Sequence, residues 1–388
     1  MSSAKTPRLS DFCTTGSGGT PSRSKLERYY EGGTIPWIKS GELRESVINR
    51  AEECVTDAAL KESSIKLVPA GAILLAMYGA TVGRLGILGI EATTNQAVCH
   101  IIPDPKIAVT RYVYHALSSQ VPNLISMGVG GAQPNINQGI IKSLPVPLPP
   151  LPEQRRIATI LDKADALKAK RREALAQLDS LTQSIFIEMF GDPMVNQKGW
   201  PMTKFSDVGS LDRGASKHRP RNAPELLGGA YPLVQTGEIA NCDGYVRSHN
   251  ASYSEFGLRQ SKLWPKGTLC ITIAANIAKT GILTFDACFP DSVVGFKAEK
   301  PETVEFVRVW LSFLQEALEA AAPESAQKNI NLAILRDLNI PFPPISLQKK
   351  FADRVSATEV LKDTHRAAMA ELDTLFASLQ HRAFQGEL

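Results

Sequence analysis

The sequence predicts a mixed α/β (α+β) protein of two tandem-duplicated globular domains, joined by two long helices that form an antiparallel coiled coil. Two observations predict this architecture. The first half of the chain is repeated in the second half at a nearly constant offset. Each copy also ends in a proline run, which is followed by a long helical pattern.

The repeat is visible in three pairs of matched segments. Residues 32–43, GGTIPWIKSGEL, match residues 228–239, GGAYPLVQTGEI, at an offset of 196. KLVPAG at 66–71 matches KLWPKG at 262–267 at the same offset. QPNINQGIIKSLPVPLPPLPEQRRI at 133–157 matches QKNINLAILRDLNIPFPPISLQKKF at 327–351 at an offset of 194. Composition alone does not keep an offset so constant, so the chain contains an internal duplication.

The globular part of each copy predicts short strands with one or two helices. Apolar runs between turn formers, such as AILLAMYGATVGRLGILG, are typical of short strands in a mixed sheet. Helices are expected at 110–121 and at the matching 304–318. Each proline run ends a globular domain and leads into a helix, because proline is disfavoured in a helix interior but well placed just before a helix or in its first turn. The predicted globular domains are therefore 1–150 and 192–344, and the predicted long helices are 151–191 and 345–388.

Each long helix carries an apolar stripe, whose residues recur three or four positions apart. A helix of roughly 37 residues is about 55 Å long and cannot bury such a stripe against one small domain. The stripes therefore predict that the two helices pair, with a globular head at each end and a pseudo two-fold axis between the heads. A coiled coil that dimerises the chain is the alternative. The residues expected in the seam are Leu161, Leu167, Leu175, Leu178, Val355, Leu361, Leu372 and Leu375.

Composition narrows the class of protein. The formal net charge of +4 and the pI of about 8.6 permit a polyanionic partner. Six scattered cysteines without a Cys-x-x-Cys pair predict buried thiols in a reducing compartment. The first residues lack the apolar core of a signal peptide, and no apolar stretch is long enough to span a membrane. We therefore expect a soluble cytoplasmic protein.

Motifs for catalysis are missing from the sequence. There is no G-x-x-x-x-G-K-[ST] loop, no G-x-G-x-x-G that opens a helix after a strand, and no Asn-Pro-Pro-Tyr signature of an amino-methyltransferase. The six histidines form no His-x-x-x-His pair. We therefore expect no catalytic residue, no metal site and no cofactor on this chain.

Polar and basic loops recur at matched positions in the two copies. Such loops are typical of proteins that bind DNA, because cations meet phosphates while Arg, Lys, Asn and Gln bond base edges. The pairs are 17–28 with 212–222, 39–40 with 235–236, and 78–84 with 274–279. Their alternatives are solvated loops, strand-end polar residues and a plain hairpin. The candidate DNA-binding residues are Ser17, Thr20, Ser22, Arg23, Lys25, Lys39, Ser40, Tyr78, Arg84, Arg213, Ser216, Lys217, His218, Arg219, Arg221, Gln235, Thr236, Asn276 and Lys279.

Several segments resemble the specificity (S) subunit of Type I restriction–modification systems. They are GGTPS, IPWIKSGEL, VPAGAILLAMYGATVGRLGI, TTNQA, QPNINQGIIKSLPVPLPPLPEQRRI and the helix end FGDP. The resemblance covers essentially the whole chain, and HRAFQGEL is similar to the family's usual ending. The second copy departs from the pattern, with PPISLQKK in place of PPLPEQRR and RGASKH in place of GGTPSR.

The resemblance implies that each head is a target recognition domain, which reads one half of a bipartite site in double-stranded DNA through the major groove. The helix pair would set the spacer and dock two methyltransferase (M) subunits, and restriction (R) subunits would join for cleavage. S-adenosylmethionine, ATP and Mg²⁺ would be bound by those partner subunits only. The S subunit itself would catalyse nothing.

Two other functions stay open at this point. One is a duplicated scaffold that binds only proteins through its coiled coil, and the other is a self-sufficient modification enzyme. Steeply salt-dependent, sequence-selective DNA binding separates an S subunit from a scaffold. Methyl transfer by the chain alone would indicate the enzyme.

Overall fold

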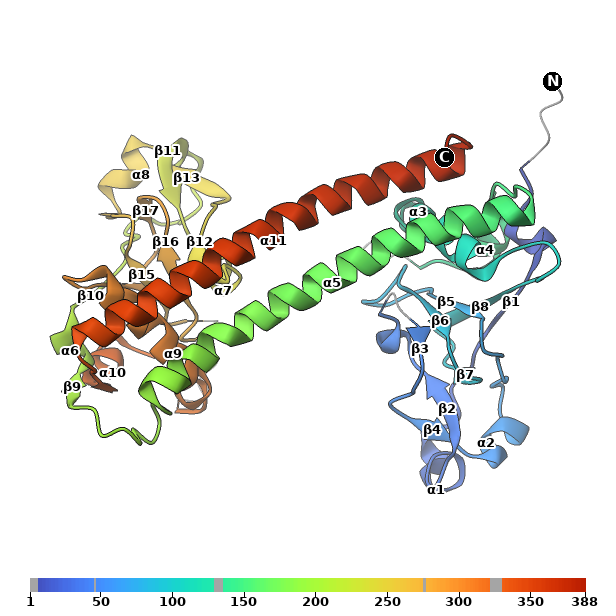
Figure 1. Ribbon diagram of the computed structural model, residues 1–388, viewed down its shortest axis with the longest axis horizontal. Helices are drawn as coiled ribbons and strands as arrows, with labels where there is room; N and C mark the ends of the chain where they lie inside the picture. Colours follow the sequence, from blue (N-terminus) through green and yellow to red (C-terminus); the bar gives the residue numbers. More distant parts are fainter. Residues whose placement is uncertain (1–5, 45–46, 129–134, 275–276, 322–329) are drawn as a thin grey trace. The chain divides into compact units, whose positions relative to one another are not determined.

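The computed structural model describes residues 6–44, 47–128, 135–274, 277–321 and 330–388 (Figure 1). The chain forms two compact units: unit 1 contains Met1–Arg172 and Ala367–Leu388, and unit 2 contains Glu173–Arg366. Each unit therefore holds one sheet domain together with one end of both long helices. Within the described ranges, every helix is too short or too polar to span a bilayer.

A five-stranded sheet forms the centre of unit 1. Its strands are β1 (Cys13–Ser17), β3 (Val47–Ile48), β5 (Ile73–Ala76), β6 (Leu85–Leu88) and β8 (Val98–Pro103). Their order is β1-β8-β5-β6-β3, and only the pair of β6 and β3 is parallel. The apolar run at 72–89 supplies β5 and β6, which are buried at every position as expected for strands covered on both faces. A smaller sheet contains β4 (Cys54–Val55), β2 (Ile35–Ile38) and β7 (Thr93–Thr94).

Unit 2 repeats the five-stranded sheet with the same strand order. Its order is β10-β18-β15-β16-β12, and again only the last pair, β16 with β12, is parallel. The strands are β10 (Ser210–Arg213), β12 (Gly244–Val246), β15 (Leu269–Thr272), β16 (Thr280–Leu283) and β18 (Val293–Lys297). The predicted duplication is therefore confirmed by topology as well as by sequence.

Unit 2 has two further sheets. One has the order β13-β11-β17-β14, and its strands are β11 (Leu227–Leu233), β13 (Ala251–Tyr253), β14 (Leu263–Trp264) and β17 (Ala287–Cys288). The other pairs β9 (Met202–Lys204) with β19 (Asn339–Pro341), which ties the start of the unit to its proline run.

Short helices close both sheet domains. In unit 1 they are α1 (Leu26–Tyr29), α2 (Asp57–Glu62), α3 (Thr110–Ser126) and α4 (Gln138–Ser143). In unit 2 they are α6 (Phe205–Val208), α7 (Thr236–Ala240), α8 (Glu255–Arg259), α9 (Pro301–Ala321) and α10 (Leu332–Asp337). α3 and α9 are the helices expected at 110–121 and 304–318. In each unit this helix packs with the sheet and the long helices into one apolar core.

The long helices are α5 (Leu151–Phe190) and α11 (Ile345–Gln385), and they pair in the antiparallel sense within each unit. In unit 1, Lys168 Nζ lies 2.7 Å from Asp373 Oδ1. In unit 2, Lys362 Nζ lies 2.7 Å from Asp179 Oδ1. Lys362 lies 194 residues after Lys168, and Asp179 lies 194 residues before Asp373. The same ion pair therefore occurs in both units, with the lysine on α5 in unit 1 and on α11 in unit 2. The intramolecular antiparallel pairing predicted from the stripes is thereby confirmed.

A buried glutamine fixes the start of each long helix against its sheet domain. Gln154 of α5 accepts a hydrogen bond from the Val109 amide (2.8 Å) and donates to the carbonyls of Ile107 (3.0 Å) and Pro149 (2.8 Å). Its counterpart on α11, Gln348, is also fully buried. It accepts from the Thr303 hydroxyl (2.8 Å) and donates to the Pro343 carbonyl (2.9 Å). The proline run is thus held to the helix that follows it by a polar side chain that both copies share.

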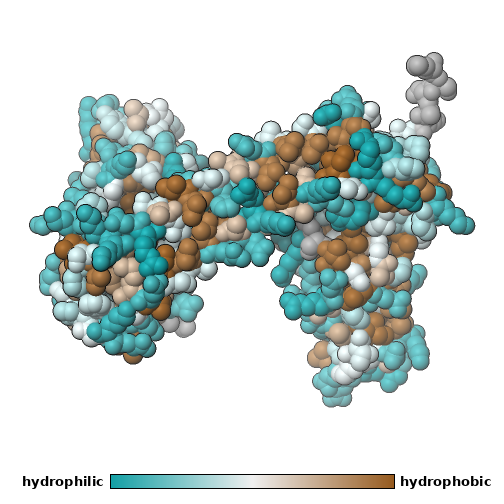
Figure 2. All heavy atoms as spheres, in the orientation of Figure 1, coloured by the Kyte–Doolittle hydropathy of each residue, from teal (hydrophilic) through white to brown (hydrophobic). Residues whose placement is uncertain are grey.

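Part of the predicted seam is wrong. Leu161 and Val355 are buried, and Leu175, Leu178 and Leu372 are half-buried, but Leu167, Leu361 and Leu375 are about half exposed. Leu167 follows Leu161 by six residues, which turns it about 120° around the helix, whereas Lys168 returns to the face of Leu161. Lys168 and Lys362, not Leu167 and Leu361, therefore face the partner helix. Figure 2 shows hydrophobic side chains among hydrophilic ones on the visible face of α5 and α11.

Candidate nucleic-acid interface

The three candidate loops of unit 1 meet at one edge of the five-stranded sheet. Strand register places Ser17, the last residue of β1, and Leu75, near the end of β5, on either side of Cys99. The loops after β1 and after β5 therefore begin at the same edge. The third loop joins them because the Asn95 amide donates to the Ile38 carbonyl (3.0 Å), directly before Lys39. We name this edge, with residues 94–98 at its centre, the loop edge of unit 1.

Unit 2 repeats this arrangement around residues 289–293. In β10, Arg213 lies opposite Val294, and Ile271 of β15 lies opposite the same residue on its other side. The loops after β10 and β15 therefore begin at one edge. The Val234 amide donates to the Cys288 carbonyl (2.9 Å), which brings residues 235–236 to the same place. This is the loop edge of unit 2.

Glycine is required where the first loop crosses this edge. The Gly19 amide donates to the Thr94 carbonyl (2.9 Å), and the matching Ala215 amide donates to the Phe289 carbonyl (3.2 Å). A Cβ atom on Gly18 would lie 1.9 Å from the Thr94 carbonyl oxygen, and one on Gly214 would lie 2.3 Å from the Phe289 carbonyl oxygen. The shared glycine thus allows the loop backbone to approach the sheet closely.

The basic loop of unit 1 is held in place by specific contacts. The guanidinium of Arg23 forms a two-pronged ion pair with Glu53 (Nη2 to Oε2, 2.9 Å) and lies 4.1 Å from the ring centroid of Tyr30. The hydrogen bond from Arg23 holds the pKa of the Glu53 carboxyl below its ordinary value. Thr20 donates to the side-chain oxygen of Gln96, and Lys25 Nζ donates to the Tyr29 hydroxyl (3.2 Å). Ser17 and Ser22 lie in the same loop; Ser22 is exposed and Ser17 partly so.

A glutamate shared by both copies orders the second pair of loops. Glu42 accepts hydrogen bonds from the amides of Lys39 and Glu52, both at 2.8 Å. Glu238, its counterpart, accepts from the amides of Gln235 (2.6 Å) and Asn250 (2.7 Å). The glutamate therefore fixes the backbone before Ser40 and Thr236 while the neighbouring side chains differ. The sequence analysis did not select this glutamate, although the matched segments 32–43 and 228–239 both contain it and its identity in both copies was the available signal.

The basic loop of unit 2 is held differently. Arg221 Nη2 lies 2.6 Å from Asp291 Oδ1, and Arg219 Nη1 donates to the carbonyls of Ser216 (2.6 Å) and His218 (2.8 Å). The His218 amide donates to Gln260 Oε1 (3.0 Å). Lys217 and Arg213 are exposed, whereas Ser216 is buried. A cavity of about 260 Å³ brings together four predicted residues, Ser216, Arg221, Gln235 and Thr236.

The third pair of loops consists of strand connections. Arg84 is exposed and Tyr78 is half-buried, in the turn between β5 and β6. The Arg84 amide donates to the Thr81 carbonyl (3.0 Å), and the Lys279 amide donates to the Thr272 hydroxyl (3.1 Å). Burial raises the pKa of Tyr78. Asn276 lies outside the described residues.

Gln96 and Asp291 are the residues that sequence reasoning missed. They occupy matching positions, 195 residues apart, at the centre of each loop edge. Gln96 accepts from Thr20, and Asp291 pairs with Arg221. Gln96 belongs to the segment TTNQA, which is part of the resemblance. Nothing in the pattern of this segment predicts that it contacts the loop 17–28.

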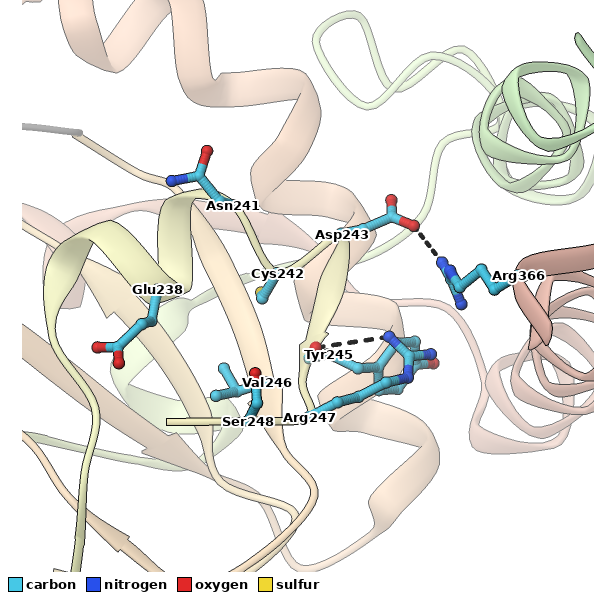
Figure 3. A pocket seen from close by; sticks show the side chains of 9 residues that line it. All are labelled: Glu238, Asn241, Cys242, Asp243, Tyr245, Val246, Arg247, Ser248 and Arg366. Carbon is cyan, nitrogen blue, oxygen red and sulfur yellow. Dashed lines mark hydrogen bonds and ion pairs between the residues drawn. The ribbon is translucent and has the colours of Figure 1, made fainter. Parts of the chain in front are cut away.

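A second cavity of unit 2, of about 360 Å³, lies where the sheet domain meets α11 (Figure 3). In Figure 3, Asp243 and Arg366 point toward each other, and they form an ion pair. Arg247 Nη2 donates to Glu359 Oε2 (2.9 Å), and the Tyr245 hydroxyl donates to Glu305 Oε2 (2.7 Å). Because these cations have carboxylate partners, we interpret this cluster as a joint that holds β12 against the helix. None of the candidate DNA-binding residues lines it.

The described residues contain no group of three or more His, Cys, Asp or Glu side chains placed to hold a metal ion.

The model of the Type I restriction modification DNA specificity domain matches residues 1–177 and again residues 197–372. The chain belongs to this specificity family. Its two matches correspond to the two copies of the repeat, and each match covers one sheet domain together with most of the long helix that follows it.

Curated relatives carry the same description. The chain is 32% identical over 171 residues to the Type I restriction enzyme EcoR124I/EcoR124II specificity subunit of Escherichia coli. The aligned residues are 43% of this chain and 42% of the Escherichia coli subunit. It is 29% identical over 238 residues to the MjaIX specificity subunit of Methanocaldococcus jannaschii, covering 56% and 53%. These matches span about half the length of the curated relatives.

Solved structures share the fold of this specificity protein over nearly its whole length. The S subunit of a Type I restriction–modification system from M. genitalium superposes with a TM-score of 0.56 at 16% identity, covering 97% of this chain and 95% of that one. A chain from a study of assembly and conformational transition of the type I R-M system gives a TM-score of 0.57 at 17% identity, covering 98% and 97%. The predicted fold class is confirmed by these neighbours.

Proposed function

We propose that this chain is the sequence-specific DNA-binding subunit of a Type I restriction–modification complex. The observation that carries the proposal is the loop edge, which occurs twice on the same scaffold with different side chains. Lys39 and Ser40 in unit 1 correspond to Gln235 and Thr236 in unit 2, and in both cases a glutamate holds the backbone. Similar scaffolds with unlike polar side chains suit two heads that read two different half-sites.

In this proposal, each loop edge reads one half of a bipartite target in double-stranded DNA, and the paired helices set the spacer. Helices of 40 and 41 residues are about 60 Å long, so if this length limits the separation of the heads, the half-site centres are no more than about 18 base pairs apart. Methyltransferase subunits, two per chain, are expected to dock along α5 and α11.

The chain contributes recognition and no chemistry of its own. S-adenosylmethionine is expected on the methyltransferase subunits, and ATP and Mg²⁺ are expected on restriction subunits that join the full complex. We expect the complex to act on chromosomal and incoming DNA in the cytoplasm.

Sequencing of methylated adenines tests the proposal. The genome of the source cell would be compared with that of a strain in which this gene is deleted. We expect an interrupted, two-part motif that is methylated only when the gene is present. A methylation pattern that is the same in both strains would contradict the proposal and would favour the protein-binding scaffold. Methyl transfer by the purified chain alone would favour the self-sufficient enzyme.

A further inference from the structure

One arginine in the basic loop of each unit is oriented by a carboxylate from elsewhere in that unit. In unit 1 the pair is Arg23 with Glu53, and in unit 2 it is Arg221 with Asp291. The two arginine side chains are 48% and 47% exposed, so neither is enclosed by the contacts that hold it. The two carboxylates come from different segments: Glu53 precedes β4, whereas Asp291 precedes β18.

The contacts of Arg23 leave a defined edge of its guanidinium available. Both terminal nitrogens, Nη1 and Nη2, bond Glu53, while Tyr30 covers one face of the guanidinium plane at 4.1 Å. Among the described residues, no hydrogen bond is recorded for Nε. The neighbouring Arg28 differs, because it directs Nε and Nη2 together at Glu62. Nη2 carries two N–H groups, and Glu53 accepts from one of them. The other N–H of Nη2 lies parallel to the N–H of Nε, so Arg23 keeps available the donor pair that Arg28 directs at Glu62.

Arg221 is fixed more loosely but in a comparable way. Its Nη2 bonds Asp291, and within the described part of the chain Nε and Nη1 have no recorded partner. The residue lines the cavity of about 260 Å³ together with Gln235 and Thr236. Both parallel donor pairs of a guanidinium include Nη2, which carries two N–H groups. Asp291 accepts from one of them, so the other can still donate beside a neighbouring nitrogen, giving two parallel hydrogen bonds to a planar acceptor.

Guanine is the base that fits such a donor pair. Its major-groove edge presents two acceptors, N7 and O6, whereas adenine presents an acceptor beside a donor. A phosphate would also accept these bonds, but a flexible lysine serves that purpose without a carboxylate to orient it. Holding a side chain in place removes conformational entropy that would otherwise be lost on binding.

We propose that Arg23 and Arg221 each read a guanine, one in each half-site, and that Glu53 and Asp291 are positioning residues for this readout. The proposal rests on the proposed function and adds a base to each half of the target. The methylated motif of the intact system must therefore contain a G·C pair in both halves.

Variants of the positioning residue test this in cells that contain the full system. In Glu53→Gln, we expect the guanine of one half-site to become degenerate in the methylated motif, while the other half-site stays unchanged. The unchanged half shows that the chain still folds and assembles. The control is Glu62→Gln, which disturbs an arginine pair in the same unit and should leave both halves intact. In unit 2, Asp291→Asn should relax the other half-site.

Binding of the purified complex to modified DNA tests the contact itself. Replacing the proposed guanine by 7-deazaguanine removes the N7 acceptor and should weaken binding about 10-fold. Arg23→Lys should weaken binding to unmodified DNA by roughly 10- to 100-fold. The affinity of this variant complex should then be the same whether or not 7-deazaguanine replaces the guanine of that half-site. Arg28→Lys, the matched control, should keep the wild-type affinity and the response.

The outcomes separate the two proposals. A two-part motif that depends on the gene but lacks a G·C pair in a half-site overturns the guanine readout and leaves the proposed function standing. The guanine readout is also overturned, with the proposed function left standing, if the complex binds the target with equal affinity when every guanine is replaced by 7-deazaguanine. Absence of any methylation that depends on the gene overturns both.

Discussion

Unit 1 and unit 2 use the same glutamate in the same way, since Glu42 and Glu238 each accept two backbone hydrogen bonds beside a loop. They also share a buried glutamine, Gln154 or Gln348, at the start of the long helix. Their basic loops are held differently, because Gln96, which accepts from Thr20 in unit 1, is replaced by Asp291, which pairs with Arg221 in unit 2. The duplication has kept side chains that satisfy backbone groups and has changed those at the loop edge.

The attachment of each sheet domain to its long helix also differs. In unit 1, Arg111 and His115 of α3 both approach Asp162 of α5, with His115 Nε2 at 2.6 Å. In unit 2, the residues matching Arg111 and His115 are Glu305 and Val309, and the charged groups belong instead to the cluster of Figure 3. The apolar packing between domain and helix is thus common to both units, while the ionic contacts arose separately in each.

The largest expected effect concerns the helix seam of unit 1. Leu161 is fully buried in the core, and Leu167 on the same helix is about half exposed. Leu161→Ala should lower the free energy of unfolding by about 2–5 kcal/mol through lost burial and a new cavity. Leu167→Ala should change it by less than about 0.5 kcal/mol. Urea denaturation of both variants measures this difference, and equal effects would mean that the seam is placed wrongly.

The next effect concerns the buried glutamines. Gln154→Leu leaves one amide and two carbonyls without partners, whereas Gln348→Leu leaves a hydroxyl and one carbonyl. An unsatisfied buried polar group costs roughly 1–3 kcal/mol. Water can reach the partners of Gln154, because Ile107 is exposed and Val109 and Pro149 are half-buried, whereas Thr303 and Pro343 are buried. Gln348→Leu should therefore destabilise the chain more than Gln154→Leu. Thermal unfolding checks the order. The control Gln177→Leu, at an exposed position on α5, should be nearly neutral.

The smallest effect is a pH dependence confined to unit 1. Burial lowers the pKa of His115 below its ordinary value, although its contact with Asp162 acts in the opposite direction. The unfolded chain therefore binds more protons than the folded chain below about pH 6.5, and stability is lost as the pH falls through that value toward the folded pKa. His115→Gln should flatten this slope between pH 7 and 5, as measured by urea denaturation.

The matched control is His381→Gln, because His381 is exposed in the same unit. This variant should keep the wild-type slope. If His115→Gln also keeps that slope, the buried histidine is not its source. Unit 2 has Val309 at the matching position, so no corresponding group exists there.

The sequence predicted the duplication, the helices and the loops because each leaves a local pattern. A matched Gly-Glu pair or a proline run followed by a stripe is visible without coordinates. Which face of each long helix packs against its partner was harder to predict from the sequence. Leu161 and Leu167 both fit a spacing of three or four residues, although Leu161 is buried and Leu167 is about half exposed. The same error recurred at Leu361, which is expected because the two helices descend from one pattern.

Contacts between distant segments could not be predicted in this way. Arg23 is 30 residues from Glu53, and Arg221 is 70 residues from Asp291. Strand register brings them together, and register depends on the whole hydrogen-bond ladder rather than on a local pattern. The predicted two-fold relation between the heads stays a prediction.

The central claim is that two separate loop edges each read one half of a DNA target. Its most direct test exchanges residues 212–222 and 235–236 for those of another specificity subunit and then maps methylated adenines. The account predicts that one half of the motif changes while the other half and the spacer stay the same. A change in both halves, or in neither, would contradict it.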